Sequence, residues 1–345
     1  MHLSRINEIL NKVLVRSKSA DHDHILGTEP VKGVRPIWLH GFARSGTTSS
    51  MYRISSCLGR NAVFEPGHKE YHDVIPGADF DDVVNLMRSV PRSEHWDDFF
   101  IGDGILSCFD TFGSDLSELN QWKRFCAYLD FLYEFAGHNV VIKEIRLFAN
   151  LTALARYHQE RSLDWLFIGI ICSPVVPLNA YYRRGWLSGS QLRKYPPELD
   201  QSNAYRLATF RRLNRFPELT SITANSPSEK LLLNCLLDQA ELRRFVSEDP
   251  ENRLLSSLDT LTDAVNWVTE RTNEEALLHP GSEQPVARTG HGVDHLFYRD
   301  VIEPLHSSLR EPLEDLWGPI HPDSMVSRGR FRRYMTSLRH RFFSQ

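Results

Sequence analysis

The chain has 345 residues, of which 41% are hydrophobic and 24% are charged, and its formal net charge is −4. This is the composition of a globular protein with one large α/β domain or two small ones, and the charge indicates neither a nucleic-acid nor a membrane-surface partner. Five scattered cysteines without a C-x-x-C pair disfavour a disulfide framework and a structural zinc site. The sequence shows no signal-peptide pattern and no apolar run of about 18 residues, so we expect a soluble, cytoplasmic protein without a membrane span.

The first thirty residues predict a short amphipathic helix, with apolar side chains at helical spacing over residues 3–15, followed by a polar linker. His22 and His24 alternate with aspartates in this linker. We interpret them as solvated rather than as a metal site, because no further ligands follow at a suitable spacing. The expected organisation is an N-terminal helix and linker at 1–30, an α/β domain at 31–322 and a basic C-terminal helix at 323–345.

Strand and helix patterns alternate along the central part of the chain. Buried-strand patterns occur at residues 36–42, 61–66, 138–147 and 163–174. Helical patterns occur at 47–58, 122–135, 147–159, 229–245 and 260–271. This alternation predicts an α/β fold with a central, mainly parallel sheet flanked by helices. Residues 76–120 are rich in Asp, Gly and Ser and predict an irregular insertion.

The strongest functional signal is HGFARSGTTSS at residues 40–50. A buried strand runs into Gly41, the chain turns through small residues, and a helix starts at Thr47 or Thr48. Such a turn can point backbone N–H groups at an anion, and the positive end of the helix dipole favours that anion. The spacing is similar to the nucleotide-binding Walker A loop, but Thr47 occupies its lysine position and the cation is Arg44 instead, which disfavours a P-loop kinase or hydrolase.

The stretch ARSGTT after a strand resembles the 5′-phosphosulfate loop of sulfotransferases that use 3′-phosphoadenosine 5′-phosphosulfate (PAPS). Motif support covers residues 36–184 and is weaker to about 320. The resemblance implies the P-loop-like sulfotransferase fold and transfer of a sulfuryl group from PAPS to a hydroxyl of a sugar or small metabolite, without a metal. The residues that it implies for the phosphosulfate are Arg44, Ser45, Gly46, Thr47 and Thr48.

The resemblance extends to Glu65, which ends NAVFEP twenty-one residues after Arg44. Carbohydrate-modifying members of the family carry a Phe-rich strand that ends in Glu-Pro at this spacing. We expect the first two strands to lie side by side, so that Glu65 faces the ligand as general base. His68 is a competing base, and a purely structural Glu65 is the alternative. A zinc pair of His68 and His72 is disfavoured, since no HExxH motif is present.

The anchor for the donor's 3′-phosphate departs from the family pattern. The family's fourth strand ends in Arg-Asp-Pro-Arg and is followed by a serine, whereas this chain reads IICSPVVPLNA. Cys172 stands at the arginine position and Ala180 at the serine position. A thiol cannot replace a bidentate arginine–phosphate pair. The substitution leaves open a rearranged 3′-phosphate site, an altered donor or a loss of catalysis.

Candidate replacements for that anchor come from three places. Ser173 can donate a hydrogen bond, and Arg183 and Arg184 can reach back from the next helix. The resemblance adds Arg288 with Gly290, since ARTG resembles a late Arg-Lys-Gly element of cytosolic members that touches the 3′-phosphate. The alternative for the arginines is a solvated helix face. Lys143 and Arg146 also fit a strand pattern of the family, and they either line the cleft or form structural ion pairs.

The last segment, residues 327–345, places aromatic and apolar side chains at helical spacing among six arginines. We expect this basic amphipathic helix to pack on its own domain, and a weak contact with an anionic membrane surface or an acidic partner is the alternative. The expected partner of the protein is otherwise a small-molecule or carbohydrate acceptor.

Overall fold

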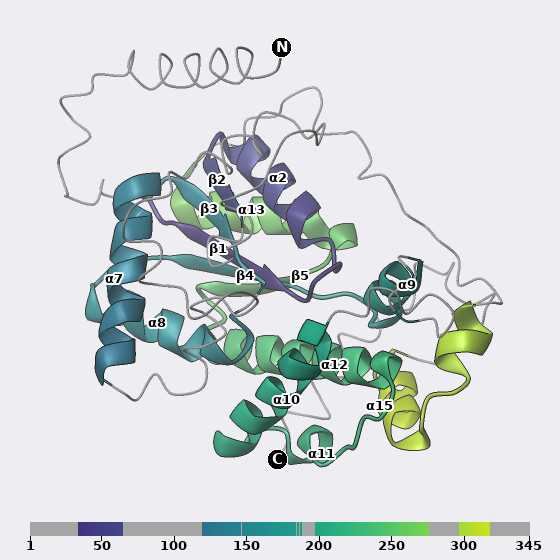
Figure 1. Ribbon diagram of the computed structural model, residues 1–345. Coiled ribbons are helices and arrows are strands. Elements are labelled where there is room, and N and C mark those ends of the chain that lie inside the picture. The colour runs from purple at the N-terminus through teal and green to yellow at the C-terminus, as the bar shows by residue number, and fades with distance from the viewer. Residues whose placement is uncertain are drawn as a thin grey trace, which may run out of the picture.

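The computed structural model describes residues 34–64, 119–145, 147–183, 185, 187, 197–274, 276 and 297–317. Within them, a five-stranded parallel sheet carries helices on both faces (Figure 1). This confirms the prediction of an α/β protein with a parallel sheet. The strands are β1 (Ile37–Gly41), β2 (Asn61–Phe64), β3 (Val140–Lys143), β4 (Leu166–Ile170) and β5 (Arg253–Ser256).

The strand order is β2-β3-β1-β4-β5, and all four neighbouring pairs are parallel. The prediction that the first two strands lie side by side is therefore wrong, because β3 separates β1 from β2. The burial pattern gives the physical reason. β3 is buried at all four residues, which suits an interior strand, whereas β2 begins with the exposed Asn61, which suits an edge.

One face of the sheet is covered by α2 (Thr47–Leu58) and α13 (Leu261–Thr272). The helix predicted at 47–58 is confirmed at both ends, and Gly59 closes α2 in a left-handed conformation. Alternate side chains of β1, such as Ile37 and Leu39, pack on this face with Met51 and Ile54 of α2.

The opposite face is covered by α7 (Leu119–Ala136), the 3₁₀ turn η2 (Phe148–Asn150) with α8 (Leu151–Glu160), and α12 (Pro227–Ser247). These helices lie where the periodicity predicts them. Ser226 and Glu229 form a capping box that starts α12, with Pro227 in its first turn.

A hydrogen-bonded chain is buried in this second core. The indole N–H of Trp38 donates to the Tyr133 hydroxyl at 2.7 Å, and that hydroxyl lies 2.6 Å from Nε2 of His158. Nδ1 of His158 lies 2.8 Å from the carbonyl of Leu154. Every member of the chain has a partner, so these polar groups are satisfied within the core.

A second helical group packs around α12 at the carboxyl end of the sheet. Its members are α9 (Val175–Arg183), α10 (Pro197–Arg212), α11 (Pro217–Thr220), the π-helix η5 (Tyr298–Ile302) and α15 (Ser307–Trp317). Their shared apolar core meets the segments that follow β1 and β3 through Phe42 and Phe148. The sequence patterns did not predict α10, α11 or α15.

Several expectations lie outside the described residues. These are the N-terminal helix at 3–15, the insertion up to residue 118, the C-terminal helix at 327–345 and both proposed domain boundaries. Among the helices that the structure does describe, none is long and apolar enough to cross a membrane.

Candidate functional site

The loop between β1 and α2 forms a tight turn. The Ser45 N–H donates to the Phe42 carbonyl at 3.0 Å, and both the N–H and the hydroxyl of Ser50 donate to the Gly46 carbonyl, at 3.0 and 3.1 Å. Among the residues that the structure describes, no side chain caps α2, and no acidic residue lies in its first turn. The free N–H groups and the positive end of the helix dipole are therefore available to an anion at this point.

Two residues of the loop adopt left-handed backbone conformations. Gly46 has φ 93°, and Arg44 has φ 70°, which is costly for a residue with a side chain. Alternation of left-handed and right-handed residues turns successive N–H groups to one side and makes a concave anion site. Strain of this kind concentrates at functional sites.

Close approach of backbone and side chains explains the two glycines. A Cβ atom on Gly41 would lie 2.6 Å from the Ile170 carbonyl oxygen and 2.7 Å from Cγ2 of Thr47. A Cβ atom on Gly46 would lie 2.5 Å from Cδ1 of Leu258, just after β5. The loop is thus packed against the carboxyl ends of β4 and β5, and both positions require glycine.

The hydroxyl residues of the loop are mostly enclosed. Ser45 and Thr47 are 2% and 3% exposed, Thr48 is half-buried and Arg44 is exposed. The Ser45 hydroxyl oxygen is buried and has no hydrogen-bond partner in the part of the chain that the structure describes. A buried hydroxyl normally has a partner, so this group is a candidate for a bond to a ligand.

The topology places the loop where open parallel sheets bind ligands. The connection from β1 leaves through α2 on one face toward β2, and that from β4 leaves through α9, α10 and α12 on the other face toward β5. These two neighbouring strands, β1 and β4, are the ones whose connections diverge. Ligands of such sheets bind at the carboxyl ends of strands at this switch point.

At the end of β4, Cys172 and Ser173 are half-buried. The carbonyl of Cys172 accepts a hydrogen bond of 2.7 Å from the buried side chain of Gln239 on α12, which fixes this turn. Although the residue is partly exposed, its thiol is enclosed, and burial raises the pKa of the Cys172 thiol to about 12. The thiol is therefore neutral at neutral pH and contributes no positive charge.

The end of β3 brings further polar groups beside β1. Lys143 is 2% exposed and lies level with Leu39 of β1 and Phe64 of β2. Nδ1 of His40 lies 2.5 Å from the Glu144 carbonyl, whereas Nε2 is buried and has no partner among the described residues. Burial, assisted by the nearby cations, lowers the pKa of His40 to about 3, so the imidazole is neutral.

The structure brings together only part of the predicted site. Arg44 through Thr48 share one loop, and Ser173 lies on the neighbouring strand end. Arg183 is exposed in the last turn of α9, about 12 Å along the helix from Val175 at its start. Five predicted site residues lie outside the described residues: Glu65, His68, Arg184, Arg288 and Gly290. Arg146 also lies outside them.

Sequence reasoning missed the polar groups beneath the loop. His40, Arg206, Asp238 and Gln239 are all buried. The available signal was the helix at 229–245, in which polar residues interrupt an apolar pattern on what should be a buried face. Within the described residues, no group of three histidine, cysteine, aspartate or glutamate side chains is placed to hold a metal ion.

Comparisons of the chain with protein-family models, with curated proteins and with solved structures find no match.

Proposed function

We propose that this chain is a PAPS-dependent sulfotransferase that transfers a sulfuryl group to a hydroxyl of a sugar or small metabolite. The observation that carries the proposal is the loop from Gly41 to Thr47. It combines a left-handed Arg44, a glycine that tolerates no side chain, and, among the described residues, a buried hydroxyl without a partner and a helix start without a side-chain cap. Each feature is one that an oxyanion site needs, and together they lie at the switch point of the sheet.

The residues present suit a phosphosulfate group. Backbone N–H groups at the start of α2 and the hydroxyls of Ser45, Thr47 and Thr48 are donors of the kind that phosphate and sulfate oxygens accept. Arg44 is exposed and adds a bidentate cation at the mouth of the loop. Lys143 lies at the end of the adjacent strand, and we propose that it faces the same ligand.

In the proposed reaction the acceptor hydroxyl oxygen forms a bond to sulfur while the bond from sulfur to the bridging oxygen breaks. The electron pair of that bond remains on the 5′-phosphate, and the hydroxyl proton passes to a base. The loop stabilises negative charge as it develops on the phosphate and sulfuryl oxygens, so positioning and electrostatics do most of the catalytic work.

We propose Glu65 as the base, with His68 as the competing candidate. Glu65 follows Phe64, which pairs with Lys143 at the end of β2. Two strand spacings of about 4.8 Å separate β2 from β1, or about 10 Å in all.

A second candidate function is a sulfotransferase-like protein with an altered donor or without catalysis. Its support is Cys172, whose neutral thiol stands where the family has an arginine. A P-loop kinase or hydrolase has less support, because Thr47 occupies the position of the lysine that such enzymes use.

A thermal-shift experiment separates the three. PAPS and its desulfated product, adenosine 3′,5′-bisphosphate, should each raise the melting temperature of the full-length protein, since a ligand that binds only the folded state stabilises it. ATP with magnesium should have no effect. A shift with ATP alone favours a kinase, and no shift with either PAPS or adenosine 3′,5′-bisphosphate refutes PAPS binding. If PAPS stabilises the protein but a separate assay detects no sulfuryl transfer to a hydroxyl acceptor, the non-catalytic alternative is favoured.

A further inference from the structure

A buried ion pair lies beneath the loop. Arg206 of α10 is 6% exposed and Asp238 of α12 is 1% exposed. Their contact is bidentate, with Nε to Oδ1 at 2.8 Å and Nη2 to Oδ2 at 3.0 Å. The third guanidinium nitrogen also donates to Ser202 on the preceding turn of α10. The guanidinium is therefore held in one orientation by hydrogen bonds from all three of its nitrogens.

The same guanidinium contacts the segments that leave two central strands. Its carbon lies 5.9 Å from the ring centre of Phe42, the residue after β1, and 3.9 Å from the ring centre of Phe148, which follows β3. Both distances are those of cation–π contacts. Phe42 is also the residue whose carbonyl accepts the Ser45 N–H that closes the loop. Arg206 thus contacts the side chain of Phe42, the residue whose carbonyl closes the turn of the loop.

Stability alone is a poor explanation for this pair. Desolvating two charges costs several kcal/mol, and well-packed apolar side chains often serve as well or better in such a place. The surrounding cluster is rich in leucine and phenylalanine, which would provide that packing. The charge of Arg206 also acts on a residue of the site. Burial is the main cause of the lowered pKa of His40, and the positive charge of Arg206 lowers it further.

We propose that Arg206 is a positioning residue for the anion-binding loop. Asp238 holds the guanidinium against Phe42, and this contact keeps the backbone from Gly41 to Thr47 in its anion-binding conformation. This role deepens the proposed function. The ligand-binding test of it rests on the proposed function, whereas the hydrogen-exchange test of loop order does not.

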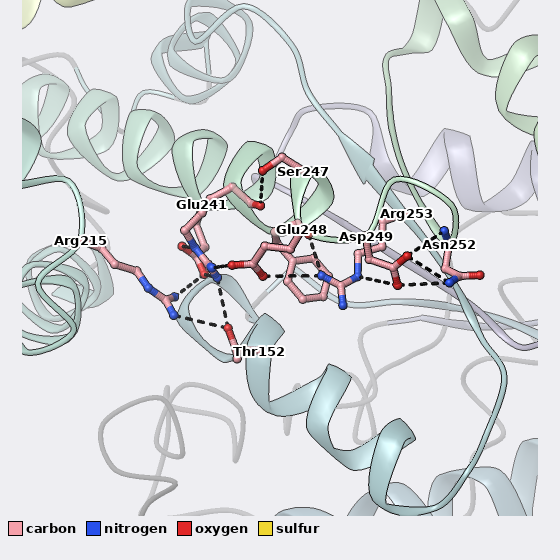
Figure 2. Close-up of polar contacts among 10 residues, drawn as sticks. Thr152, Arg215, Glu241, Ser247, Glu248, Asp249, Asn252 and Arg253 are labelled. Carbon is pink, nitrogen blue, oxygen red and sulfur yellow. Dashed lines mark hydrogen bonds and ion pairs between the residues drawn. The ribbon is translucent and has the colours of Figure 1, made fainter. Parts of the chain in front are cut away.

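The chain offers a matched control on the same helix. Glu241 lies three residues after Asp238 and is also fully buried. Its carboxylate accepts hydrogen bonds from Nη1 of Arg215 at 2.5 Å and from Nη2 of Arg244 at 2.8 Å. Figure 2 shows these contacts together with Thr152 of α8 and the Glu248–Arg253 contacts. Arg215→Lys therefore alters a pair between a half-buried arginine and a buried carboxylate, at residues that do not belong to the loop.

The first measurement is hydrogen exchange of the amides of residues 42–47 in the ligand-free, full-length protein. Lysine keeps the charge but lacks the planar fork. Arg206→Lys should exchange at least tenfold faster than wild type in this segment, and Arg215→Lys should stay within twofold. Equal exchange in wild type and Arg206→Lys overturns the inference, as does an equal increase in Arg215→Lys. If Arg206→Lys does not fold, the apolar double variant Arg206→Met/Asp238→Leu takes its place with the same expectation.

The second measurement is calorimetry with adenosine 3′,5′-bisphosphate. Arg206→Lys should bind at least tenfold more weakly than wild type, and Arg215→Lys within twofold of it. Equal affinity of the two variants overturns the inference. Wild type that does not bind this probe refutes the proposed function instead, and the hydrogen-exchange result then decides the positioning role alone.

Discussion

The carboxyl end and the amino end of the sheet both contain charged clusters built on α12, but only the second cluster extends to the protein surface. At the carboxyl end, Asp238 meets a single arginine, and the pair is sealed among apolar side chains and the aromatic rings beside the loop. Toward the amino end, Glu241 meets two arginines, and the contacts continue through Glu248 to Arg253 at partly exposed positions (Figure 2).

The difference separates two uses of buried charge. A cluster that reaches the surface keeps part of its hydration and can exchange partners, so it ties α8, α12 and β5 together at modest cost. In the sealed pair, the carboxylate of Asp238 holds the guanidinium of Arg206 in one geometry, and the loss of one partner alone is costly. The sealed pair of Arg206 and Asp238 lies beside the loop, for which we propose a fixed conformation.

The largest effect should come from removing one charge of each cluster. Asp238→Asn removes the carboxylate that pairs with the buried Arg206 and should lower the free energy of unfolding by about 3–5 kcal/mol. Glu241→Gln should cost less, about 1–3 kcal/mol, because Arg215 and Arg244 retain Thr152 and Arg244 retains Glu248. Urea unfolding measures both, and a larger cost for Glu241→Gln contradicts the comparison.

The next effect distinguishes the loop from an ordinary turn. Gly46→Ala combines left-handed strain with a clash against Leu258 and should cost about 2–4 kcal/mol. Gly137→Ala is the matched control, since Gly137 has φ 72° with no atom within 4 Å of an added Cβ, and should cost only about 1–2 kcal/mol. Equal costs in denaturant unfolding would show that the loop is not packed against β5.

A smaller effect depends on pH and compares two histidines. Burial lowers the pKa of His40 and of His158 to about 3 in the folded protein, against about 6.5 when unfolded. Between pH 6.5 and 3 the unfolded chain therefore binds protons that the folded one does not, and stability falls as the pH falls. Each histidine contributes up to about 1.4 kcal/mol per pH unit.

His40→Asn and His158→Asn should each flatten the fall in the free energy of unfolding between pH 6.5 and 5, by similar amounts. Unfolding in urea at several pH values measures the slopes. A slope as steep as that of wild type in either variant would mean that the histidine is already charged in the folded protein.

The smallest effect belongs to a charge at the surface. Arg156 and Glu160 form an i, i+4 pair on α8 whose side chains are 52% and 42% exposed. Glu160→Gln should change the free energy of unfolding by no more than about 0.5 kcal/mol. A cost comparable with that of Asp238→Asn would remove the distinction between sealed and exposed charge on which the comparison depends.

Local patterns predicted the elements that carry the loop but not their arrangement. The strand before Gly41 and the helix at 47–58 follow from apolar spacing and small residues, which are properties of adjacent residues. Strand order depends on which strands have two apolar faces and on long connections, so the neighbour of β1 was predicted wrongly. Arg206 and Asp238 lie thirty-two residues apart on different helices, and their pairing depends on how α10 packs on α12.

Calorimetric titration of PAPS into full-length wild type and Arg44→Ala measures whether the loop from Gly41 to Thr47 holds the 5′ end of PAPS. Arg44 is exposed, so its removal should leave the unfolding transition unchanged. A charge-assisted contact contributes about 1.5–3 kcal/mol, so we expect Arg44→Ala to bind PAPS at least tenfold more weakly. Equal affinity of the two proteins for PAPS would contradict it.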